Sequence, residues 1–258
     1  MLEKLKINLK DKIILVTGSS YGIGFSIAKV FIENGAKVVF NSRSASNLKK
    51  ALKKINSPNA FSITADVTKP DQAIFLINEI QKKFGKINHI ICNVGSGKSV
   101  SPGNESYEEW QRIFHVNFWS ATNIIEASKD ILAFSKGSIV CISSICGEEV
   151  ILNAPITYSV AKAALNSYVK GISKPLGKLG VRINAISPGN ILFKGSVWDK
   201  KLKEDPAMVE EIIEKEVPLG KLGDTDEIAY LSLWLVSSYA SFCTGSVFTI
   251  DGGQTRSL

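Results

Sequence analysis

Histidine is scarce in this sequence, and its cysteines stand apart from one another. The 258 residues include two histidines, His89 and His115, and four cysteines, namely Cys92, Cys141, Cys146 and Cys243. Neither histidine has the spacing of a metal-ligand motif and no C-x-x-C pair occurs, so no metal site is expected. Because the cysteines fall mostly in apolar runs, we expect buried, reduced thiols in a cytoplasmic protein.

A long unbroken apolar run is also missing. Residues 1–12 are charged and lack the apolar core of a signal peptide. Residues 228–250 carry no charge, but small polar residues such as Ser237, Ser238 and Thr244 interrupt them. A helix, a turn and a strand fit this stretch better than a membrane span. We therefore expect no membrane partner.

Acidic residues are fewer than basic ones, and the formal net charge is +7. A basic balance of this kind can indicate a nucleic-acid partner. The lysines are scattered over many segments, however, with acidic residues interspersed, which is typical of solvated helix faces. We expect no nucleic-acid partner and only a weak attraction to small molecules that bear phosphate.

Short apolar runs alternate with longer amphipathic segments along the chain. The runs predict strands at residues 13–17, 37–41, 60–65, 87–93, 138–143, 182–187 and 246–250. The amphipathic segments predict helices at residues 23–34, 46–55, 69–84, 107–133, 156–178 and 227–237. Strands that are apolar throughout are buried on both faces, as in a parallel sheet. The pattern predicts one α/β domain over residues 1–258, a doubly wound Rossmann fold with about seven parallel strands and helices on both faces.

A glycine-rich turn connects the first predicted strand to the first predicted helix. It reads Thr-Gly-Ser-Ser-Tyr-Gly-Ile-Gly over residues 17–24, with the spacing G-x-x-x-G-x-G. Glycines at such a turn allow backbone amides to approach a pyrophosphate, and the start of the helix faces the negative charge. A glycine cluster alone is more often a plain turn. Its place at the opening of an alternating domain favours dinucleotide binding.

The end of the second predicted strand indicates which dinucleotide is bound. The sequence there is Asn41-Ser42-Arg43, without the acidic residue that would bind the ribose hydroxyls of NAD. Arg43 is placed to accept a 2′-phosphate, although a solvated loop arginine would look the same. The missing acid and the arginine agree, so the sequence predicts NADP(H).

Tyr158 and Lys162 lie four residues apart on a predicted helix and therefore share one face. A free tyrosine has a pKa of about 10, which is too high for easy proton transfer at neutral pH. A nearby ammonium group favours the phenolate and lowers that pKa, which makes tyrosine a usable general acid or base. Such a pair occurs by chance on many helices, and its weight comes from the glycine-rich turn that precedes it.

Two other patterns carry little weight. Gly97-Lys98-Ser99 looks like the end of a P-loop, but Cys92 stands where the first glycine is needed. Lys98 and Ser99 are better interpreted as rim residues of a substrate cleft. Ser144 lacks the G-x-S-x-G elbow of a hydrolase, and neither histidine has a paired context.

Several further short motifs follow one another in a known order. They are Ala-Asp-Val-Thr at 65–68, Cys-Asn-Val-Gly at 92–95, Asn117, Ile-Ser-Ser at 142–144, Asn-Ala-Ile-Ser-Pro-Gly at 184–189, Val-Pro-Leu-Gly at 217–220, Asp-Glu-Ile-Ala at 226–229, and Thr-Gly through Asp-Gly-Gly at 244–253. With the glycine turn and the Tyr-Lys pair, they make the chain resemble the short-chain dehydrogenase/reductase superfamily from about Lys12 to Gly253. The pattern is most similar to members that resemble 3-oxoacyl-carrier-protein reductase.

The resemblance implies hydride transfer between C4 of a nicotinamide and a carbonyl or secondary alcohol. Tyr158 would exchange a proton with the substrate oxygen, and Lys162 would lower the tyrosine pKa and hold the nicotinamide ribose. Ser144 would donate a hydrogen bond to the substrate oxygen, and Asn117 would help to hold a water that connects Lys162 with solvent. The expected cofactor contacts are Gly18, Ser20, Tyr21, Gly22, Ile23, Ser42, Arg43, Asp66, Val67, Asn93, Tyr158, Lys162, Pro188, Gly189 and Ile191.

Three features depart from the family pattern. Cys92 replaces the first asparagine of its motif, which would loosen a structural hydrogen bond. The segment between Ser144 and Tyr158 is one residue longer than expected. Phe193 stands where the family commonly has a threonine near the nicotinamide carboxamide, which suggests a different lid or substrate pocket.

The sequence indicates the substrate and the oligomeric state less directly than it indicates the cofactor. Ligands of such folds lie beyond the carboxyl ends of the strands, so residues 190–217 are the expected lid, and their mixed composition identifies no single substrate. The helix predicted at 107–133 is rich in aromatic residues, and the resemblance implies a homotetramer, with a dimer second. Two alternatives stay open, an NAD-dependent alcohol or sugar dehydrogenase and a non-catalytic dinucleotide sensor or scaffold.

Overall fold

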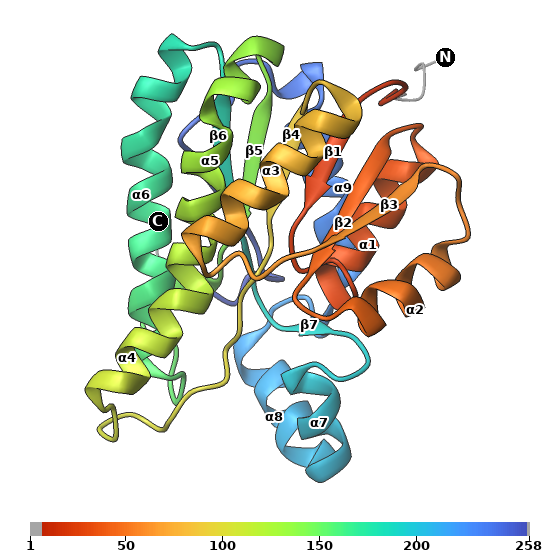
Figure 1. Cartoon of the computed structure of the whole chain (residues 1–258). Helices are drawn as coiled ribbons and strands as arrows, with labels where there is room; N and C mark the ends of the chain where they lie inside the picture. The colour runs from red at the N-terminus through yellow and green to blue at the C-terminus, as the bar shows by residue number, and fades with distance from the viewer. Residues whose placement is uncertain (1–6, 257–258) are drawn as a thin grey trace.

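Seven short apolar segments form one parallel sheet in the computed structural model, which describes residues 7–256 (Figure 1). Half of the segment predicted to hold no signal peptide, namely residues 1–6 of residues 1–12, lies outside the described residues. The sheet has the strand order β3-β2-β1-β4-β5-β6-β9. The strands are β1 (Ile13–Val16), β2 (Lys37–Ser42), β3 (Ala60–Thr64), β4 (His89–Cys92), β5 (Ser138–Ile142), β6 (Arg182–Pro188) and β9 (Val247–Ile250). The predicted doubly wound sheet is confirmed.

Burial on both faces explains why the strands read as continuous apolar runs. In β1, Ile13 and Leu15 pack into the hydrophobic core on one face of the sheet. Ile14 and Val16 alternate with them and pack into a second core on the other face. Because side chains alternate along a strand, an entirely apolar strand supplies both cores.

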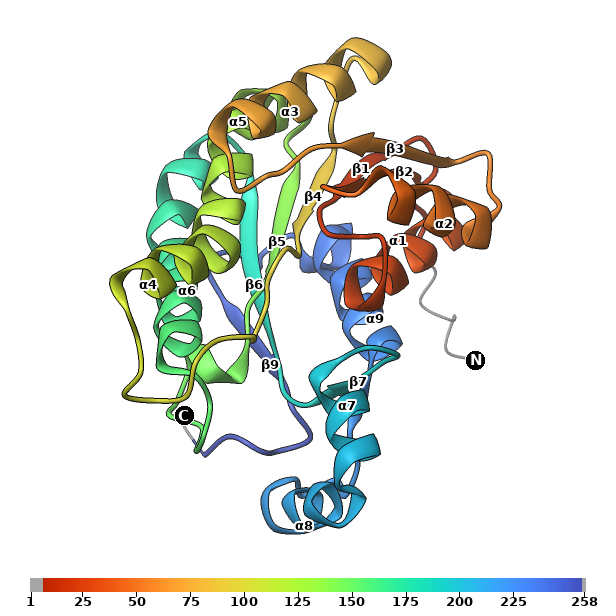
Figure 2. The same cartoon turned by 60° about the horizontal axis from the view of Figure 1, so that its bottom comes forward.

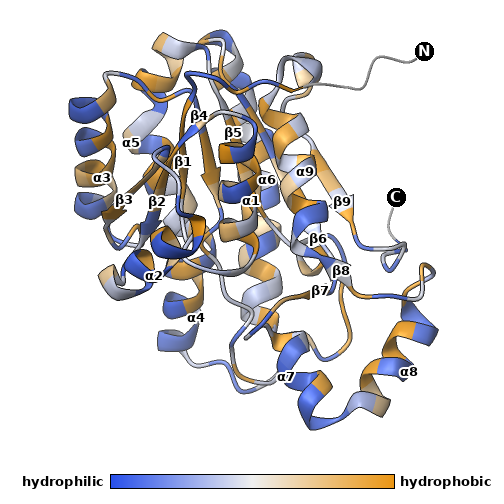
Figure 3. Cartoon of the chain, turned by 90° about the vertical axis from the view of Figure 1, so that its right-hand side faces the viewer, coloured by the Kyte–Doolittle hydropathy of each residue, from blue (hydrophilic) through white to orange (hydrophobic). Residues whose placement is uncertain are grey.

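Two layers of helices cover the sheet (Figure 2). The first core includes residues of α3 (Pro70–Phe84), α5 (Ser120–Ser135) and α6 (Ile156–Lys178). The second includes residues of α1 (Gly22–Glu33), α2 (Ala45–Ile55) and α9 (Thr225–Val236). Figure 3 shows apolar residues gathered in the sheet and on the helix faces beside it. The predicted helices thus form because each has one apolar face to bury.

The segment predicted as one helix over 107–133 consists of three pieces. It forms α4 (Tyr107–Phe114), a π-helical turn η1 (His115–Trp119) and α5. Inside the turn, the Asn117 side chain donates from Nδ2 to the Ile113 carbonyl at 3.1 Å, and the Ser120 amide donates to the His115 carbonyl. Single π-turns of this kind are frequent at functional sites. The apolar period across 107–133 does not reveal the extra residue in the turn.

Residues 190–217 contain two helices that the hydropathy pattern did not predict. They are α7 (Val197–Glu204) and α8 (Pro206–Glu216), capped by the side chains of Ser196 and Asp205. Two short parallel strands, β7 (Ile191–Leu192) and β8 (Gly223–Asp224), anchor this excursion at its base. In Figure 1 it projects beyond the end of the sheet. Two 3-10 turns, η2 (Ile145–Gly147) and η3 (Ser238–Ala240), complete the elements. No helix within residues 7–256 is long and apolar enough to cross a membrane.

The cysteines are all unpaired but differ in burial. Cys92 and Cys141 face each other across β4 and β5 and are buried, as predicted. Cys146 and Cys243 are only partly buried, so the prediction of buried thiols was wrong for these two. Cys146 lies in the short turn η2 and Cys243 in the loop before β9, where apolar neighbours in the sequence do not guarantee a place in the core.

His89 makes the stability of the fold sensitive to acid. Its Nδ1 is hydrogen-bonded to the Ser138 hydroxyl at 2.8 Å, and burial, with the positive charges of Lys12 and Arg182, lowers its pKa from 6.5 to about 3. Between these two pH values the unfolded chain binds a proton at this site that the folded chain does not. Stability from His89 is therefore present above about pH 6.5 and is lost as the pH falls toward about 3.

We expect the urea midpoint of unfolding to fall between about pH 7 and about pH 4.5. His89→Gln, which keeps a polar partner for Ser138, should lose less stability over the same interval. An equal loss in both proteins would contradict the assignment of this acid sensitivity to His89.

Candidate active site

The carboxyl ends of β1 and β4 define the crevice of this fold. These two strands are neighbours at the centre of the sheet, and the strand order reverses between them. In open α/β sheets such a switch point is where ligands bind. The glycine-rich turn leaves β1 here, and the segment from Asn93 to Gly95 leaves β4 beside it.

The glycine-rich turn has the backbone of an anion cradle. Gly18 and Gly22 have φ values of 61° and 60°, a region that favours glycine. The N-cap residue of α1 is Tyr21, and no side chain caps the helix there. The first amides of α1 are therefore left to a ligand, and the helix dipole favours a negative one. These features fit the pyrophosphate of a dinucleotide.

Asn93 ties the glycine turn to β4. Its Nδ2 donates to the carbonyls of Thr17 and Gly18, each at 3.1 Å, and its amide donates to the Thr17 hydroxyl at 3.0 Å. Gly24 passes so close to Asn93 that a Cβ there would meet Nδ2, and would lie 2.7 Å from the Gly18 carbonyl oxygen. Asn93 thus positions the cofactor turn. The Cys92 beside it is buried in the sheet and leaves these bonds intact.

The carboxyl ends of β2 and β3 form the second part of the predicted cofactor site. Arg43 is exposed and forms no ion pair with any residue in the described range, and Ser42 precedes it at the end of β2. Asp66 accepts hydrogen bonds from the Thr68 amide and hydroxyl at 3.1 and 2.7 Å. These bonds shape the turn in which Val67 lies. An unpartnered arginine at this point suits a phosphate better than a ribose hydroxyl.

Two asparagines that the sequence did not single out support this end of the site. Asn123 of α5 donates to the Val67 carbonyl at 3.2 Å and so fixes the turn after β3. Asn41 donates to the carbonyls of Ile63 and Ala65, while its buried Oδ1 has no partner among the described residues. Buried acceptors are normally paired, so this oxygen also fits a ligand group. In the sequence, the only sign of a role for Asn41 was its place before Ser42 and Arg43, and for Asn123 its place on the helix that follows Asn117.

Ser144, Tyr158 and Lys162 come together from two elements. Ser144 ends the segment after β5 and accepts a hydrogen bond from the Cys146 amide at 3.2 Å. Tyr158 and Lys162 lie on α6, and the Lys162 ammonium lies 5.9 Å from the tyrosine ring centre. Lys162 is buried and donates from Nζ to the Ile142 carbonyl at 2.8 Å. The expected constellation is therefore present.

Gly147 allows this assembly to form. A Cβ at Gly147 would lie 2.6 Å from the carbonyl carbon of Lys162, so only glycine lets η2 pack directly on α6. Asn166 of α6 donates to the Gly147 carbonyl at 3.2 Å and holds the turn in place. Both residues position Ser144 relative to Tyr158, and neither belongs to the motifs recognised in the sequence.

Burial shifts the pKa values of both Tyr158 and Lys162. It raises the pKa of the Tyr158 phenol, and the adjacent Ser144 hydroxyl offsets only part of that rise. Burial also lowers the pKa of the Lys162 ammonium to about 8, so it remains mostly charged at neutral pH. Removal from water disfavours the charged form of both groups, so the tyrosine pKa is raised and not lowered as the Tyr-Lys spacing predicted. Tyr158 consequently rests in its protonated form.

Asn117 fixes the loop above Lys162 by its side chain. Its Nδ2 donates to the Ser96 carbonyl at 3.1 Å, and its Oδ1 accepts from the Ser96 amide at 2.9 Å. A Cβ at Gly95 would be 3.1 Å from both Asn117 Oδ1 and Lys162 Nζ, so the two groups approach this glycine from close range. The π-turn thus brings Asn117 beside Lys162, and Oδ1 keeps one acceptor position beyond its bond to Ser96.

The loop that follows Gly95 is tied down by polar contacts. The Ser99 hydroxyl is hydrogen-bonded to Glu109 and to the Thr157 hydroxyl, each at 2.6 Å. Arg112 pairs with Glu109 and donates to the Lys98 carbonyl at 2.9 Å. Together these bonds lower the pKa of the Glu109 carboxyl to about 2. Ser99 therefore links the loop to Thr157, the residue before Tyr158, and its place on the rim of a substrate cleft stays a prediction. Lys98 is exposed, as a rim residue would be.

Phe193 brings the lid onto the glycine turn. A Cβ at Gly22 would be 2.7 Å from the Phe193 ring, and the rings of Phe193 and Tyr21 are 6.4 Å apart. Pro188 ends β6, Gly189 follows it, and the buried Ile191 starts β7, so all three lead directly into this contact. The departure of Phe193 from the family pattern is thus structural, because its ring occupies the space that a side chain at residue 22 would fill.

The predicted site residues therefore gather along one edge of the sheet. The residues of the glycine-rich turn lie at the start of α1, and Ser42, Arg43, Asp66 and Val67 lie at or just after the ends of β2 and β3. Of the catalytic candidates, Ser144 follows β5, Asn117 lies in η1, and Tyr158 and Lys162 lie in the first turns of α6. The uncapped α1, the glycine cradle and the unpartnered Asn41 Oδ1 fit a dinucleotide. The packing adds the role of Gly147 and shows what Phe193 and Gly95, already noted in the sequence, contact.

Comparison with known proteins agrees with this geometry. The family model described as enoyl-(acyl carrier protein) reductase, of the short-chain type, matches residues 18–255. The 3-oxoacyl-[acyl-carrier-protein] reductase of Chlamydia muridarum is 33% identical over 253 residues, covering 95% of this chain and 98% of the relative.

Two solved structures share the whole fold. L-sorbose reductase from Gluconobacter frateurii, complexed with NADPH and L-sorbose, has a TM-score of 0.91 at 25% identity, covering 98% of this chain and 100% of that one. A 7α-hydroxysteroid dehydrogenase, complexed with NADH and 7-oxo glycochenodeoxycholic acid, has a TM-score of 0.89 at 27% identity, with 100% of both chains covered. With these matches and the site geometry together, the chain belongs to the short-chain dehydrogenase/reductase superfamily of oxidoreductases.

Proposed function

We propose that this protein is an NADP(H)-dependent reductase of a carbonyl substrate, with Tyr158 as the general acid. The observation that carries the proposal is the convergence of Ser144, Tyr158 and Lys162 beside the glycine cradle. A protein that only senses a dinucleotide would need the cradle but not a protonated phenol next to it. The reduction of a carbonyl needs both.

The protein's part in the reaction follows from the state of these groups. The nicotinamide, when bound, supplies or receives the hydride. Tyr158, held in its protonated form by burial, gives its proton to the carbonyl oxygen, and Ser144 donates a hydrogen bond to the same oxygen as charge develops there. The Lys162 charge stabilises the phenolate that remains. Asn117 keeps Lys162 in contact with a water that returns the proton.

The proposed preference for NADP(H) rests on the end of β2. Arg43 is exposed and has no acidic partner, and no acidic residue ends the strand. A 2′-phosphate could accept two hydrogen bonds from its guanidinium group, whereas a ribose hydroxyl would gain little. One of the two solved structures above contains NADPH and the other contains NADH. The cofactor preference proposed for this chain therefore rests on its own residues.

Arg43→Ala is expected to raise the Kd for NADPH by roughly tenfold or more, because a charge-assisted bond contributes about 1.5–3 kcal/mol. The Kd for NADH should change by less than about twofold. Fluorescence titration of both cofactors checks this, and Lys50→Ala on the outer face of α2 is a matched control. Equal weakening of both cofactors would make Arg43 a bystander.

The whole proposal is tested by titrating the purified protein with NADPH and NADH, then assaying a carbonyl panel. The panel should contain an acyl thioester, a ketose and an oxosteroid, the classes named in its relatives. Tighter binding of NADPH, with turnover of one class, is the expected result. Preference for NADH would favour the alternative NAD-dependent dehydrogenase, and binding without any turnover would favour a sensor.

We also propose that the protein forms a homotetramer, with a dimer as the second possibility. Large side chains are exposed along the layer of α3 to α5, including Phe75, Tyr107, Trp119 and Phe134, of which Phe134 is 84% exposed. These exposed apolar side chains are the candidate contacts with further copies of the chain. Gel filtration with light scattering should give the mass of a tetramer, and Trp119→Glu should lower it. A wild-type monomer would contradict the proposal.

A further inference from the structure

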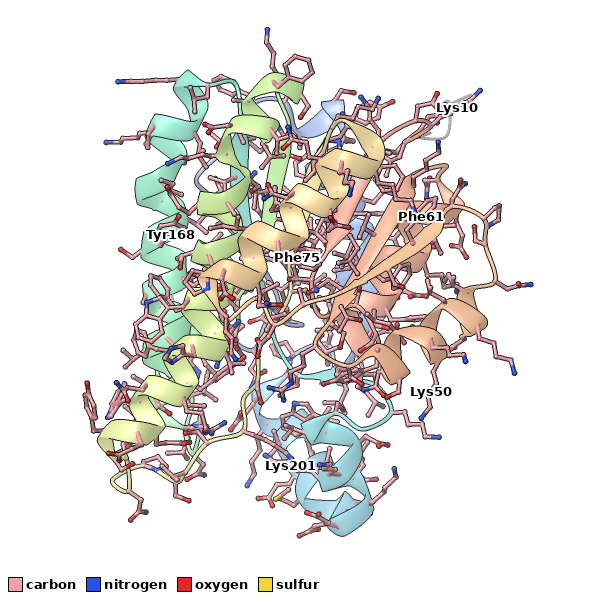
Figure 4. All side chains as sticks on the ribbon, in the orientation of Figure 1. Lys10, Lys50, Phe61, Phe75, Tyr168 and Lys201 are labelled. Carbon is pink, nitrogen blue, oxygen red and sulfur yellow. The ribbon has the colours of Figure 1, made fainter. Side chains whose placement is uncertain are left out.

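A second cavity lies at the edge of the sheet opposite to the candidate active site. It has a volume of about 540 Å³ and is formed by the amino ends of β1, β4 and β6, the turn after α5, and the segment that follows α9. Figure 4 labels Lys10 near this edge and Lys201 on the lid at the other end of the molecule. The cavity is within the range of small-molecule sites, and nothing in the proposed reaction uses it.

The charges in this cavity are all of one sign. Its lining includes Lys12, Lys136 and Arg182, and it contains no aspartate or glutamate. Neither lysine forms a salt bridge within residues 7–256. Arg182 is held in place by carbonyl oxygens of Leu235, Ser237 and Cys243. A cation near the carboxyl end of a helix is often stabilised by the helix dipole. Here only Arg182 is bonded to carbonyl oxygens at the end of α9. The ammonium groups of Lys12 and Lys136 form no such bond among the described residues.

His89 adds an imidazole nitrogen, Nε2, that has no hydrogen-bond partner among the described residues. It lines the cavity and is only 9% exposed, and its Nδ1 is bonded to Ser138. Its Nε2 has no hydrogen bond to any residue in the described range. The fields of Lys12 and Arg182 reach the ring, since both lower its pKa. Ser238 and Ser241 also line the space, and serine hydroxyls can donate hydrogen bonds to an anion.

We propose that this cavity is a binding site for a small phosphate-bearing anion, separate from the cofactor site. Two unpaired ammonium groups match the double charge of a phosphate, and the imidazole and hydroxyl groups can complete its hydrogen bonds. Inorganic phosphate and the phosphate of a small metabolite share this chemistry. Occupation would stabilise the fold by mass action, because the site exists only in the folded chain.

The test uses the two histidines as NMR reporters. His89 faces the cavity, and His115 lies on the exposed side of η1, so His115 is an internal reference. Titration with inorganic phosphate at about pH 7 or just above it, where the phosphate is largely a dianion, should shift the imidazole resonances of His89 but not those of His115. Sodium chloride at equal ionic strength should cause no such shift.

The cofactor site also attracts phosphate, so each titration is repeated with saturating NADPH. The double variant Lys12→Gln/Lys136→Asn, in which asparagine keeps the left-handed backbone of residue 136 (φ 45°), should weaken phosphate binding at least tenfold. Lys10→Gln is the matched control, since Lys10 lies near the same edge but outside the lining. Tighter binding of ribose 5-phosphate than of inorganic phosphate would identify a metabolite as the ligand, and equal binding would identify free phosphate.

Three results would overturn the proposal. His89 could fail to respond to any phosphate compound, the response could vanish with NADPH bound, or the double variant could bind as the wild type does. None of these bears on Tyr158 or on the turnover of carbonyl substrates. Failure of the anion site and failure of the reductase proposal are therefore distinguishable.

Discussion

Tyr158→Phe is expected to reduce kcat by about 10³-fold or more, to the limit of detection. The substitution removes a single oxygen from a partly buried ring and leaves the packing in place. General acid catalysis contributes about 10²- to 10⁴-fold, and here the lost proton would have no other donor within reach of the substrate oxygen. The Kd for NADPH should stay within about threefold of wild type, because the glycine cradle and Arg43 are untouched.

The matched control is Tyr168→Phe on the same helix. Tyr168 packs edge-on against Phe118 and burial raises its pKa also, so it shares the helix, the residue type and the environment of Tyr158. It lies away from Ser144 and should retain wild-type kcat. If Tyr158→Phe turns over substrate at the wild-type rate, Tyr158 is not the general acid and the proposed mechanism fails.

Gly24→Ala is expected to disrupt the cofactor cradle and to destabilise the fold. The new methyl group would collide with Asn93 Nδ2 and lie 2.7 Å from the Gly18 carbonyl oxygen, so the bridge between β1 and β4 must shift. Overpacking of this kind costs about 1–3 kcal/mol. Displaced turn amides should raise the Kd for NADPH by at least about tenfold, which titration and urea unfolding together would measure.

Gly171→Ala supplies the comparison. Gly171 lies inside α6, and a Cβ there would meet no atom within 4 Å. Because alanine favours a helix over glycine by roughly 0.5–1 kcal/mol, this variant should be as stable as wild type or more so. If Gly24→Ala behaves like Gly171→Ala in both assays, the close contact of Gly24 with Asn93 does not support the cofactor site.

Local patterns were sufficient to place most of the fold. Each predicted strand of the main sheet is present within a few residues of its expected bounds, because apolar runs between glycine-rich or polar turns have few other ways to bury both faces. Helices with an apolar face were recognised for the same reason. The lid helices α7 and α8 were not, because their sequences are dominated by charge, and capping by Ser196 and Asp205 rather than burial defines their starts.

The candidate site divides in the same way. Tyr158, Lys162, Asn93 and the glycines were predictable because each belongs to a motif of fixed local spacing. The supporting residues Gly147 and Asn123 were not, because each acts on a segment distant in the sequence, and the contact of Phe193 with Gly22 was not predicted for the same reason. The protonation of Tyr158 also escaped prediction, since the pKa depends on burial as well as on the lysine one turn away.

The sequence by itself determined the layered α/β architecture, the place of the dinucleotide cradle and the identity of the candidate catalytic groups. These depend on local periodicity and on spacing along the chain. Only the tertiary structure decided that Phe193 closes on Gly22, that burial keeps Tyr158 protonated, and that Lys12, His89, Lys136 and Arg182 surround one cavity. These four residues lie between positions 12 and 182 in the chain. Parallel pairing brings the amino ends of their strands, and the turn that holds Lys136, to one edge of the sheet. Charge and solvation at such an edge are properties of the packed sheet and not of any one segment.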